Sequence, residues 1–366
     1  MIGNGCITVR GSAGRRMLFA VLAALVFVAS ARPASAYDIG VFYFPGWLTG
    51  SAFWKDLQGS PGSRSPGVPW PEREPLLGFN YPEEAVWVAE KEIDWASSHG
   101  ITFFAFDWYW LGTHPETEHA EQAFLKAKNR GKMRFCLHWA NHNEAPRTMQ
   151  EFDDMVQYWQ DRYFSKPEYY SIDGRPVVFV FSPDMLARQS MVLRTTPQAL
   201  LDRAQAAVRT AGGRGIYFIA TTNERPGDVA EKRLRLYGFQ AYTGWNYVRS
   251  KDGSRVADYD SMVDTYLDFY RAAAGTKHQL PYIVPASPGF DDRPWFGSRA
   301  TVRSDPTPAK FVRMLTGAKV LLDDPHTSPK VLMIEAWNEY DEGSVIAPTK
   351  KWGTQYIDAI RKVFGP

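Results

Sequence analysis

Short runs of apolar, aromatic and β-branched residues alternate along the chain with longer segments in which apolar residues recur at helical spacing. The short runs predict eight strands, at residues 39–44, 101–107, 133–139, 177–181, 216–221, 238–243, 281–286 and 331–337. The longer segments predict eight helices, near residues 83–98, 117–129, 148–163, 197–211, 227–234, 258–273, 307–322 and 353–363. Strands and helices therefore follow each other in strict alternation.

This alternation of nearly continuous apolar strands with helices indicates a parallel sheet covered by helices. Eight such units predict an α/β fold, a single (β/α)8 TIM barrel over residues 37–366, with long strand-to-helix connections at 49–80, 250–257 and 288–305. A doubly wound open sheet is the rival architecture. The sequence disfavours it, because no Gly-rich dinucleotide-binding motif follows the first strand and no phosphate-binding loop occurs.

Residues 1–36 have the three parts of a secretory signal peptide. Arg15 and Arg16 precede an uncharged apolar run over residues 17–28, and Ala34-Ser35-Ala36 follows as a cleavage site. The apolar run is shorter than the roughly 20 residues that span a bilayer. We therefore expect cleavage after Ala36, a secreted or periplasmic protein, and no stable membrane insertion after cleavage.

Charge and cysteine content narrow the range of partners. The 366 residues include 42 Lys and Arg against 40 Asp and Glu, and four of the arginines lie in the leader, which has no acidic residue. The remaining chain has no dense basic stripe, so nucleic acid is not expected as a partner. Cys6 lies in the leader and Cys136 in an apolar run, which leaves no cysteine pair for a disulfide. No quaternary state is predicted.

In barrels of this kind, the chemistry lies at the C-terminal ends of the strands. In this sequence those ends carry aromatic residues, amides, carboxylates and one histidine. Aromatic faces cover the C–H surfaces of sugars while amides and carboxylates bind their hydroxyls, so the mixture predicts a carbohydrate site. The predicted substrate-binding residues are Tyr43, Asp107, Trp108, Trp110, His138, Trp139, Asn141, Asn143, Tyr242, Trp245, Trp337 and Asn338. Tyr109 and Asn246 stand at the same strand ends.

The densest signal is the segment 335–343, Glu-Ala-Trp-Asn-Glu-Tyr-Asp-Glu-Gly, at the end of the eighth predicted strand. Glycoside cleavage needs one carboxyl that protonates the leaving oxygen and another that acts as base or nucleophile. Burial and mutual repulsion can separate the pKa values of two neighbouring carboxyls and so supply both roles. Glu339 and Glu342 are therefore the predicted catalytic residues, although a solvated acidic loop is the simpler reading of such spacing.

The sequence predicts less specific roles for the other polar residues at the strand ends. His138 fits a hydrogen-bonded structural residue as well as a catalyst, and Asp107 with its aromatic neighbours fits barrel packing as well as a sugar clamp. Glu335 shares the strand face of Glu339 and needs a buried partner, for which an arginine is expected. Asp291 and Asp292 read as a solvated face. No zinc-binding motif occurs among the seven histidines, so neither a metal nor a cofactor is expected.

Five segments together are similar to glycoside hydrolase family 99 and its WbsX-like relatives. They are residues 39–45 (IGVFYFP), 100–110 (GITFFAFDWYW), 138–143 (HWANHN), 173–179 (DGRPVVF) and 336–343 (AWNEYDEG), and they span nearly the whole predicted mature chain. The sharpest element is the Trp-Asn-Glu-x-x-Glu-Gly motif. The Trp-Ala-Asn-His-Asn segment within 138–143 and the Trp-Asn-Glu-Tyr segment within 336–343 look closer to the WbsX-like branch, whose members often carry a glycosyltransferase label.

The resemblance implies a metal-independent retaining hydrolase that cuts α-mannosidic bonds within a chain. It assigns Glu339 as the base that takes the proton of the sugar 2-hydroxyl, which then attacks its own anomeric carbon to give a 1,2-anhydro sugar. It assigns Glu342 as the general acid and base. We therefore expect a secreted hydrolase of a polysaccharide or oligosaccharide. A glycosyltransferase of polysaccharide assembly and a carbohydrate-binding barrel without catalysis are the two other hypotheses.

Overall fold

The computed structural model describes residues 36–143, 145–250, 252–275 and 278–365, together with residues 1 and 3. The predicted signal peptide, residues 1–36, therefore lies almost wholly outside the described residues. In the described part of the chain, no helix is long and apolar enough to cross a membrane.

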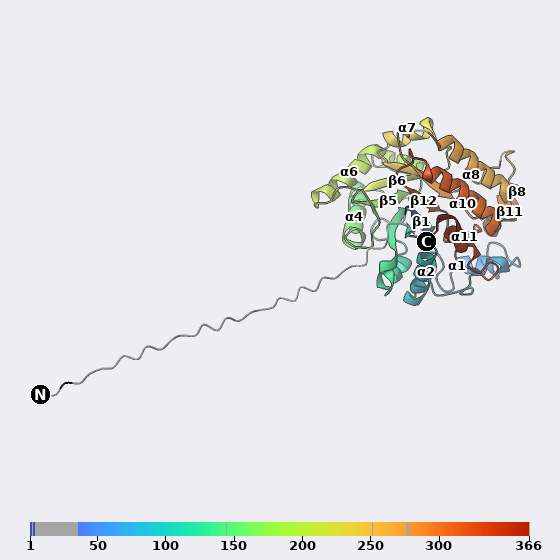
Figure 1. Cartoon of the computed structure of the whole chain (residues 1–366), viewed down its shortest axis with the longest axis horizontal. Coiled ribbons are helices and arrows are strands. Elements are labelled where there is room, and N and C mark those ends of the chain that lie inside the picture. The colour runs from blue at the N-terminus through green and yellow to red at the C-terminus, as the bar shows by residue number, and fades with distance from the viewer. Residues whose placement is uncertain (2, 4–35, 144, 251, 276–277, 366) are drawn as a thin grey trace. The chain divides into compact units, whose positions relative to one another are not determined.

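In the part of the chain that the structure describes, eight parallel strands pair in the order β1-β2-β3-β5-β6-β7-β9-β12. Pairing of β12 with β1 closes them into a barrel (Figure 1). The strands are β1 (Asp38–Tyr43), β2 (Phe103–Trp108), β3 (Arg134–Trp139), β5 (Arg175–Val180), β6 (Tyr217–Thr222), β7 (Ala241–Gly244), β9 (Tyr282–Ala286) and β12 (Val331–Ile334). This closed parallel barrel with intervening helices confirms the predicted (β/α)8 fold.

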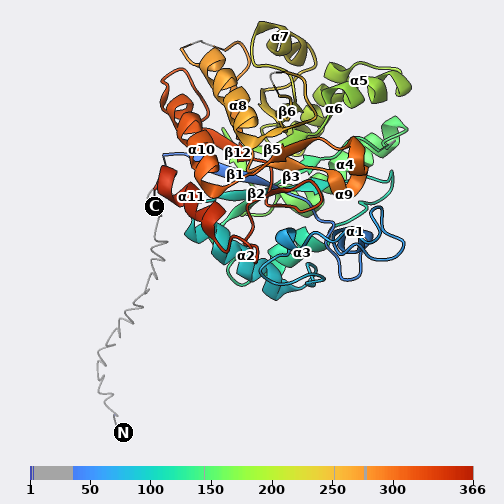
Figure 2. The ribbon, with the colours of Figure 1, turned by 90° about the vertical axis from the view of Figure 1, so that its right-hand side faces the viewer.

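Within the described residues, eight helices cover the barrel, one after each strand. They are α2 (Val86–Ser98), α3 (His119–Lys126), α4 (Met149–Trp159), α6 (Pro197–Thr210), α7 (Asp228–Leu236), α8 (Tyr259–Ala273), α10 (Pro308–Asp323) and α11 (Gln355–Phe364). Figures 1 and 2 show α8, α10 and α11 side by side. All eight overlap the predicted helical segments.

Local sequence signals explain where several helices begin. The side-chain oxygens of Thr148, Thr196 and Thr307 accept a hydrogen bond from the backbone N–H three residues later, at the first turns of α4, α6 and α10. In α6 and α10 the cap is followed at once by a proline. Proline suits this position because its missing N–H would have no helical partner there.

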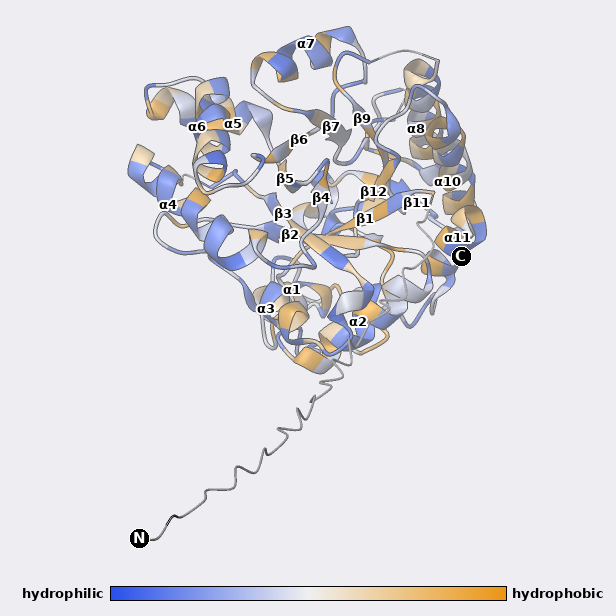
Figure 3. Ribbon diagram, turned by 60° about the vertical axis from the view of Figure 1, so that its left-hand side comes forward, coloured by the Kyte–Doolittle hydropathy of each residue, from blue (hydrophilic) through white to orange (hydrophobic). Residues whose placement is uncertain are grey.

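The strands are buried on both faces, between the barrel interior and the helices. All six residues of β2 are buried, and the only partly exposed residue of β1 is its first. Figure 3 shows β1 and β12 as mainly hydrophobic, whereas the outer helices mix hydrophobic and hydrophilic residues. This is the pattern of a parallel sheet that carries a helix layer.

The strand-to-helix connections carry further short elements. They are helices α1 (Ala52–Leu57), α5 (Pro183–Val192) and α9 (Arg293–Phe296), 3-10 turns η1 (Pro71–Arg73) and η4 (Gly297–Arg299), and strands β8 (Val256–Asp258), β10 (Phe290–Asp291), β11 (Val302–Ser304), β13 (Asn338–Glu339) and β14 (Ser344–Val345). The remaining short elements are η2 (Arg130–Lys132), the π-helical turn η3 (Gln160–Phe164) that continues α4, and β4 (Ser171–Ile172).

The long β1–α2 connection folds around a small core of its own. Its large side chains pack with one another and with Tyr340 rather than with the main core. The indole Nε1 of Trp47 donates to the backbone carbonyl of Asn338 at 2.8 Å, which ties this core to β13. The connection is therefore an ordered wall beside the barrel mouth. The core comprises Trp47, Trp54, Leu57, Trp70, Tyr81, Val88 and Tyr340.

The end of the eighth strand and the helix after β5 differ from the prediction. The eighth strand ends at Ile334, three residues before its predicted end, because the chain leaves the barrel sheet there and forms the β13–β14 hairpin. Helix α5 was not predicted. Ser182 caps its first turn and Pro183 is its first residue, a start signal that lies directly after the apolar run of β5.

Candidate active site

Glu339 and Glu342 lie on a short hairpin at the C-terminal end of the last barrel strand. In the hairpin, Glu339 of β13 pairs with Ser344 of β14, so Glu342 falls in the connecting turn. Gly343 closes this turn with φ of +67°, a conformation that favours glycine. Glu339 is 7% exposed, and Glu342 is partly exposed. The hairpin therefore holds two carboxyls at the mouth of the barrel.

The carboxyls at the barrel mouth disfavour each other's ionisation. Burial raises the pKa of Glu339 well above its usual range, and the charge of Glu342 adds to this rise. Burial also raises the pKa of Glu342 to about 7, with contributions from Asp292 and Asp107. Two neighbouring carboxyls of this kind retain a proton at neutral pH that belongs to the pair. The pair can thus offer one acid and one base.

Glu335 lies deeper, directly after β12, and is 1% exposed. Its Oε2 accepts hydrogen bonds from the side-chain amide of Asn246 at 2.5 Å and from the hydroxyl of Ser287 at 3.3 Å. These partners are neutral, which corrects the expectation of an arginine. Burial and the charge of Glu342 raise the pKa of Glu335 well above its usual range, and a protonated carboxyl does not require a cation.

Asp107 and His138 form a second polar pair inside the barrel. Oδ1 of Asp107 lies 2.6 Å from Nδ1 of His138, and the hydroxyl of Thr221 lies 3.3 Å from Nε2. His138 is fully buried, so it offers no surface to a ligand. Its role in this geometry is to orient Asp107, which is 5% exposed and contributes to the raised pKa of both Glu339 and Glu342.

Trp245 and Tyr109 supply the aromatic surface at the barrel mouth. The ring of Trp245 stacks on His138 with centroids 5.2 Å apart and an interplanar angle of 30°, and it contacts Phe42. Both Trp245 and Tyr109 are partly exposed. Burial raises the pKa of the Tyr109 phenol well above its usual range, and Asp107 and Glu339 add to the rise, so this hydroxyl lies among the carboxyls.

Six predicted sugar contacts lie instead between the barrel and the helices, each at most 2% exposed. In a strand, successive side chains point to opposite faces. Because Asp107 and His138 face the interior, Trp108 and Trp139 must face the helices, where both contact Trp159. This burial leaves the six no surface for a sugar. They are Tyr43, Trp108, Trp110, Trp139, Tyr242 and Trp337.

The three predicted asparagines bind backbone rather than solvent. Asn141 exchanges two hydrogen bonds with the backbone of Ser182, at 2.9 and 2.8 Å. Asn338 makes a similar pair of 2.8 Å bonds with the backbone of Phe44. Asn143 donates at 2.6 Å to a backbone carbonyl of the β2–α3 connection. They join neighbouring strand-to-helix connections and so shape the barrel mouth.

The β9–α10 connection supports the hairpin turn, whereas the sequence predicted a solvated face there. The guanidinium of Arg73 bonds the carboxylate of Asp291 at 2.8 Å and donates to the backbone carbonyls of Tyr340 and Asp341, each at 2.9 Å. The backbone N–H of Asp291 also donates to the carbonyl of Glu342 at 2.6 Å. Arg73 is 7% exposed, so these contacts are shielded from solvent.

Several residues of the site had no role assigned from the sequence. Tyr109 and Asn246 stood at predicted strand ends, and Ser287 directly follows the last residue of β9. The strand-end rule therefore pointed to all three. Arg73 had no such signal, because it comes from the middle of a long connection. Among the described residues, no three His, Cys, Asp or Glu side chains form a group that could hold a metal ion.

Comparisons with known proteins identify the family and the fold of the chain. A family model described as "Glycosyltransferase WbsX" matches residues 72–360. A curated relative, the "Uncharacterized protein WxcX" of Xanthomonas campestris pv. campestris (strain B100), is 23% identical over 316 residues, which are 78% of this chain and 42% of the relative. The chain thus spans about two fifths of the length of the curated relatives it matches.

Two solved structures share the fold. A "Glycoside hydrolase-like protein" aligns with a TM-score of 0.65 and 18% identity over 92% of this chain and 98% of the other. The GH99 endo-alpha-mannosidase of Bacteroides thetaiotaomicron aligns with a TM-score of 0.59 and 17% identity, over 89% and 95% of the two chains. The barrel is thus one that glycoside hydrolases use. Because the family model covers most of its length, the chain belongs to the WbsX family.

Proposed function

We propose that this protein is a retaining glycoside hydrolase that cleaves α-linked glycans with Glu339 and Glu342. The observation that carries the proposal is the pair of carboxyls with raised pKa on one hairpin at the end of the last barrel strand. A retained proton next to a second carboxyl is what glycoside cleavage requires. The fold shared with the endo-alpha-mannosidase supports an α-mannan as the first substrate to test.

The proposed reaction is the one that the resemblance to glycoside hydrolase family 99 implies, and it needs one proton shared between the two carboxyls. Glu339 takes the proton of the sugar 2-hydroxyl, and that oxygen attacks the anomeric carbon. The bond to the leaving oxygen breaks as Glu342 protonates it. Glu342 then takes a proton from water, whose oxygen attacks the anomeric carbon and opens the 1,2-anhydro ring, while Glu339 returns its proton to the 2-oxygen. Two inversions at one carbon give net retention of configuration.

The surroundings assist this chemistry by burial and by charge. Trp245 and Tyr109 can cover the apolar face of a sugar ring, which also excludes water from the carboxyls. Asp107 places a negative charge near the reacting carbon, where positive charge develops in an oxocarbenium-like transition state. Coupling to the deeper Glu335 also raises the pKa of Glu339, which favours retention of a proton by this group of carboxyls.

A glycosyltransferase of polysaccharide assembly is the second candidate, and the description of the family model favours it. Such an enzyme needs an activated sugar donor with its phosphate groups. The proposed signal peptide favours hydrolysis instead, because activated sugars are scarce outside the cytoplasm. Detection of the mature chain, cleaved after Ala36, in the periplasm or medium would support that location, and cytoplasmic full-length chain would contradict it.

The test is product formation from α-mannans, α-glucans and bacterial polysaccharides, followed by chromatography. Wild type should release oligosaccharides, while Glu339→Gln and Glu342→Gln should each lower the rate by about 10²- to 10⁴-fold. Glu84→Gln, at an exposed position on the β1–α2 connection, is the matched control and should keep full activity. Transfer from sugar nucleotides without hydrolysis would favour the transferase, and binding without either reaction would favour a carbohydrate-binding barrel.

A further inference from the structure

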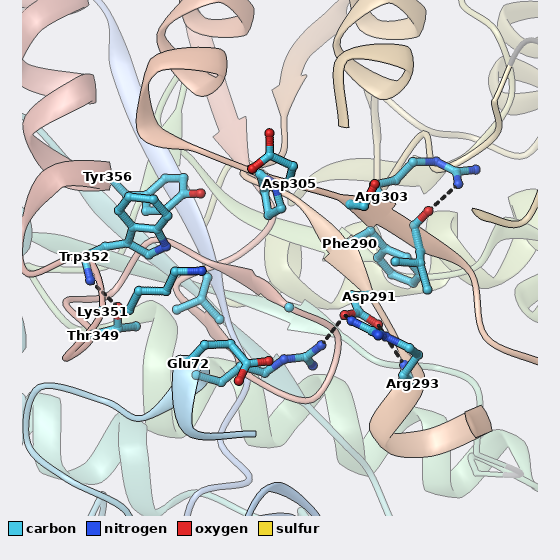
Figure 4. A pocket seen from close by; sticks show the side chains of 16 residues that line it. Glu72, Phe290, Asp291, Arg293, Arg303, Asp305, Thr349, Lys351, Trp352 and Tyr356 are labelled. Atoms are coloured by element: carbon cyan, nitrogen blue, oxygen red, sulfur yellow. Dashed lines mark hydrogen bonds and ion pairs between the residues drawn. The ribbon is translucent and has the colours of Figure 1, made fainter. Parts of the chain in front are cut away.

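A pocket of about 250 Å³ lies beside the carboxyl pair, on the same end of the barrel. Its lining comes from the β1–α2, β9–α10 and β12–α11 connections and from the first turn of α11. We call it the Trp352 pocket (Figure 4). None of the substrate contacts predicted from the sequence lines it.

The β13–β14 hairpin separates the Trp352 pocket from the carboxyl pair. Gly343 and Val345 line the pocket. In the hairpin, Val345 pairs with Asn338, and the adjacent pair is Ser344 with Glu339. Neighbouring positions of a strand face opposite sides, so Val345 and Glu339 lie on opposite faces of the hairpin. A ligand that reaches both must cross the turn that carries Glu342.

One side of the pocket is aromatic. The rings of Trp352 and Tyr356 meet edge to face with centroids 6.1 Å apart, and Figure 4 shows them next to each other. Trp352 is partly exposed, and the ammonium of Lys351 lies 5.0 Å from the centroid of its ring. In Figure 4 the Lys351 side chain reaches from this side toward the middle of the pocket. The aromatic side thus also carries an ammonium that can donate hydrogen bonds.

The charged groups of the pocket come in both signs. Arg73 and Arg293 are both bound to the carboxylate of Asp291. Lys351 and Glu72 form no ion pair with any residue that the structure describes, so an ammonium and a carboxylate are left to bind a ligand. An anionic ligand would meet the carboxylates of Glu72 and Asp305. A neutral ligand with many hydroxyls fits this mixture better.

We propose that the Trp352 pocket is an accessory carbohydrate subsite that binds one neutral sugar residue of the glycan, on the far side of the hairpin from Glu339. The inference rests on the proposed function for the kind of ligand. The pocket offers an aromatic side for the C–H face of a sugar ring, and a donor and an acceptor for its hydroxyls. Its volume is below that of drug-sized sites, so it fits a single sugar ring. A long glycan held in the subsite would cross the turn that carries Glu342.

The experiment measures binding apart from cleavage. In the Glu342→Gln chain, which should bind without turnover, calorimetry compares α-mannan and α-glucan hexasaccharides before and after a second substitution. Trp352→Ala should weaken the binding of the preferred hexasaccharide about fivefold, the effect of losing one ring contact. Lys351→Ala, at an exposed position, should weaken it as well without disturbing the fold. Trp87→Ala, an exposed tryptophan on α2, is the matched control.

The outcomes separate this subsite from the proposed reaction. Unchanged affinity in both Trp352→Ala and Lys351→Ala would overturn the subsite even if the wild-type chain cleaves glycans. Loss of affinity in both, with no cleavage by wild type, would support the subsite and reject the hydrolase. If the Glu342→Gln chain binds neither hexasaccharide, or if Trp87→Ala weakens binding equally, the subsite is rejected.

Discussion

Oε1 of Glu92 accepts a hydrogen bond of 3.1 Å from the indole Nε1 of Trp337, the residue midway between Glu335 and Glu339. Oε2 of the same carboxyl accepts a 2.9 Å bond from the hydroxyl of Tyr43. Glu92 belongs to α2, so this helix supports from outside the barrel the segment that carries the candidate catalytic residues. Two predicted sugar contacts thus have a structural role instead.

The stability of the fold should depend on the protonation of Glu92. Burial raises the pKa of Glu92 to about 8 from an ordinary value of 4.5. The folded chain therefore keeps a proton that the unfolded chain releases, so this stabilisation is full below pH 4.5 and is lost as the pH rises to about 8. The loss is at most about 1.4 kcal/mol per pH unit in this window.

Urea unfolding at pH 5 and pH 8.5 tests this effect. The free energy of unfolding of wild type should fall between the two pH values, and other buried carboxyls add to the fall. Glu92→Gln cannot ionise, so its fall should be smaller by a few kcal/mol, whereas exposed Glu84→Gln should match wild type. Equal falls in wild type and Glu92→Gln would show that Glu92 is ionised in the folded protein.

In the pH–rate profile, the pH at which kcat/KM falls on the alkaline side should depend on the charge of Asp292. Burial and the charge of Asp292 raise the pKa of Glu342 to about 7, and loss of this acid's proton should lower kcat/KM above pH 7. Asp292→Asn removes the charge, so the pKa of Glu342 drops and the fall in kcat/KM should move to lower pH by about half a unit. A fall that stays in place would exclude Asp292 as a cause.

The control for that profile is Asp184→Asn, at an aspartate that is 74% exposed and pairs with Arg233 away from the hairpin. Its profile should match that of wild type. The carboxylate of Asp292 accepts a 2.7 Å bond from the backbone N–H of Thr301, and asparagine keeps that acceptor. A shift in Asp292→Asn therefore reports the lost charge rather than a lost contact.

The fold followed from the sequence because its signals are local. Apolar runs of strand length and segments of helical period specify each element by themselves, and strict alternation permits few topologies. The hairpin motif was also visible, since both carboxyls and Gly343 lie within five residues. Arg73 was not, because its contacts with Tyr340 and Asp291 join positions more than 200 residues apart in sequence.

The errors in the predicted sugar contacts have one main physical cause. The predicted contacts include consecutive residues at strand ends, although successive residues of a strand face opposite sides. Applied to β2 and β3, that alternation selects either Asp107 and His138 or Trp108 and Trp139, but never all four. The choice of face depends on which side packs against the helices, and only the assembled structure shows that α4 covers the tryptophans.

Two tryptophan substitutions test this division between the faces. Trp245→Ala, at the barrel mouth, should raise KM about tenfold with little change in stability, because Trp245 is partly exposed. Trp139→Ala, at 1% exposure between β3 and α4, should lower the free energy of unfolding by about 3–5 kcal/mol. Glycan hydrolysis and urea unfolding measure both. A tenfold rise in KM for Trp139→Ala without loss of stability would place its ring at the ligand.

Arg73 should position the turn that carries Glu342. Its guanidinium fixes two carbonyls of the turn, of Tyr340 and Asp341, and also binds Asp291. Arg73→Met should cost about 3–5 kcal/mol of stability, because it leaves buried polar groups without a partner. Arg73→Lys can keep the pair with Asp291 but cannot bind both carbonyls as a planar fork does, so kcat should fall in both variants.

A lower kcat of Arg73→Lys than of wild type, at a temperature where the variant is fully folded, would show that Arg73 positions the turn of Glu342. KM should change little, because the guanidinium of Arg73 is already bound by the turn carbonyls and by Asp291. Arg203→Met removes an exposed pair with Asp153 on the outer helices and should change stability by less than about 1 kcal/mol and kcat not at all. If Arg73→Lys loses stability but keeps the wild-type kcat when folded, the turn holds Glu342 in place without this arginine, and its support must come from the 2.6 Å backbone bond to Asp291.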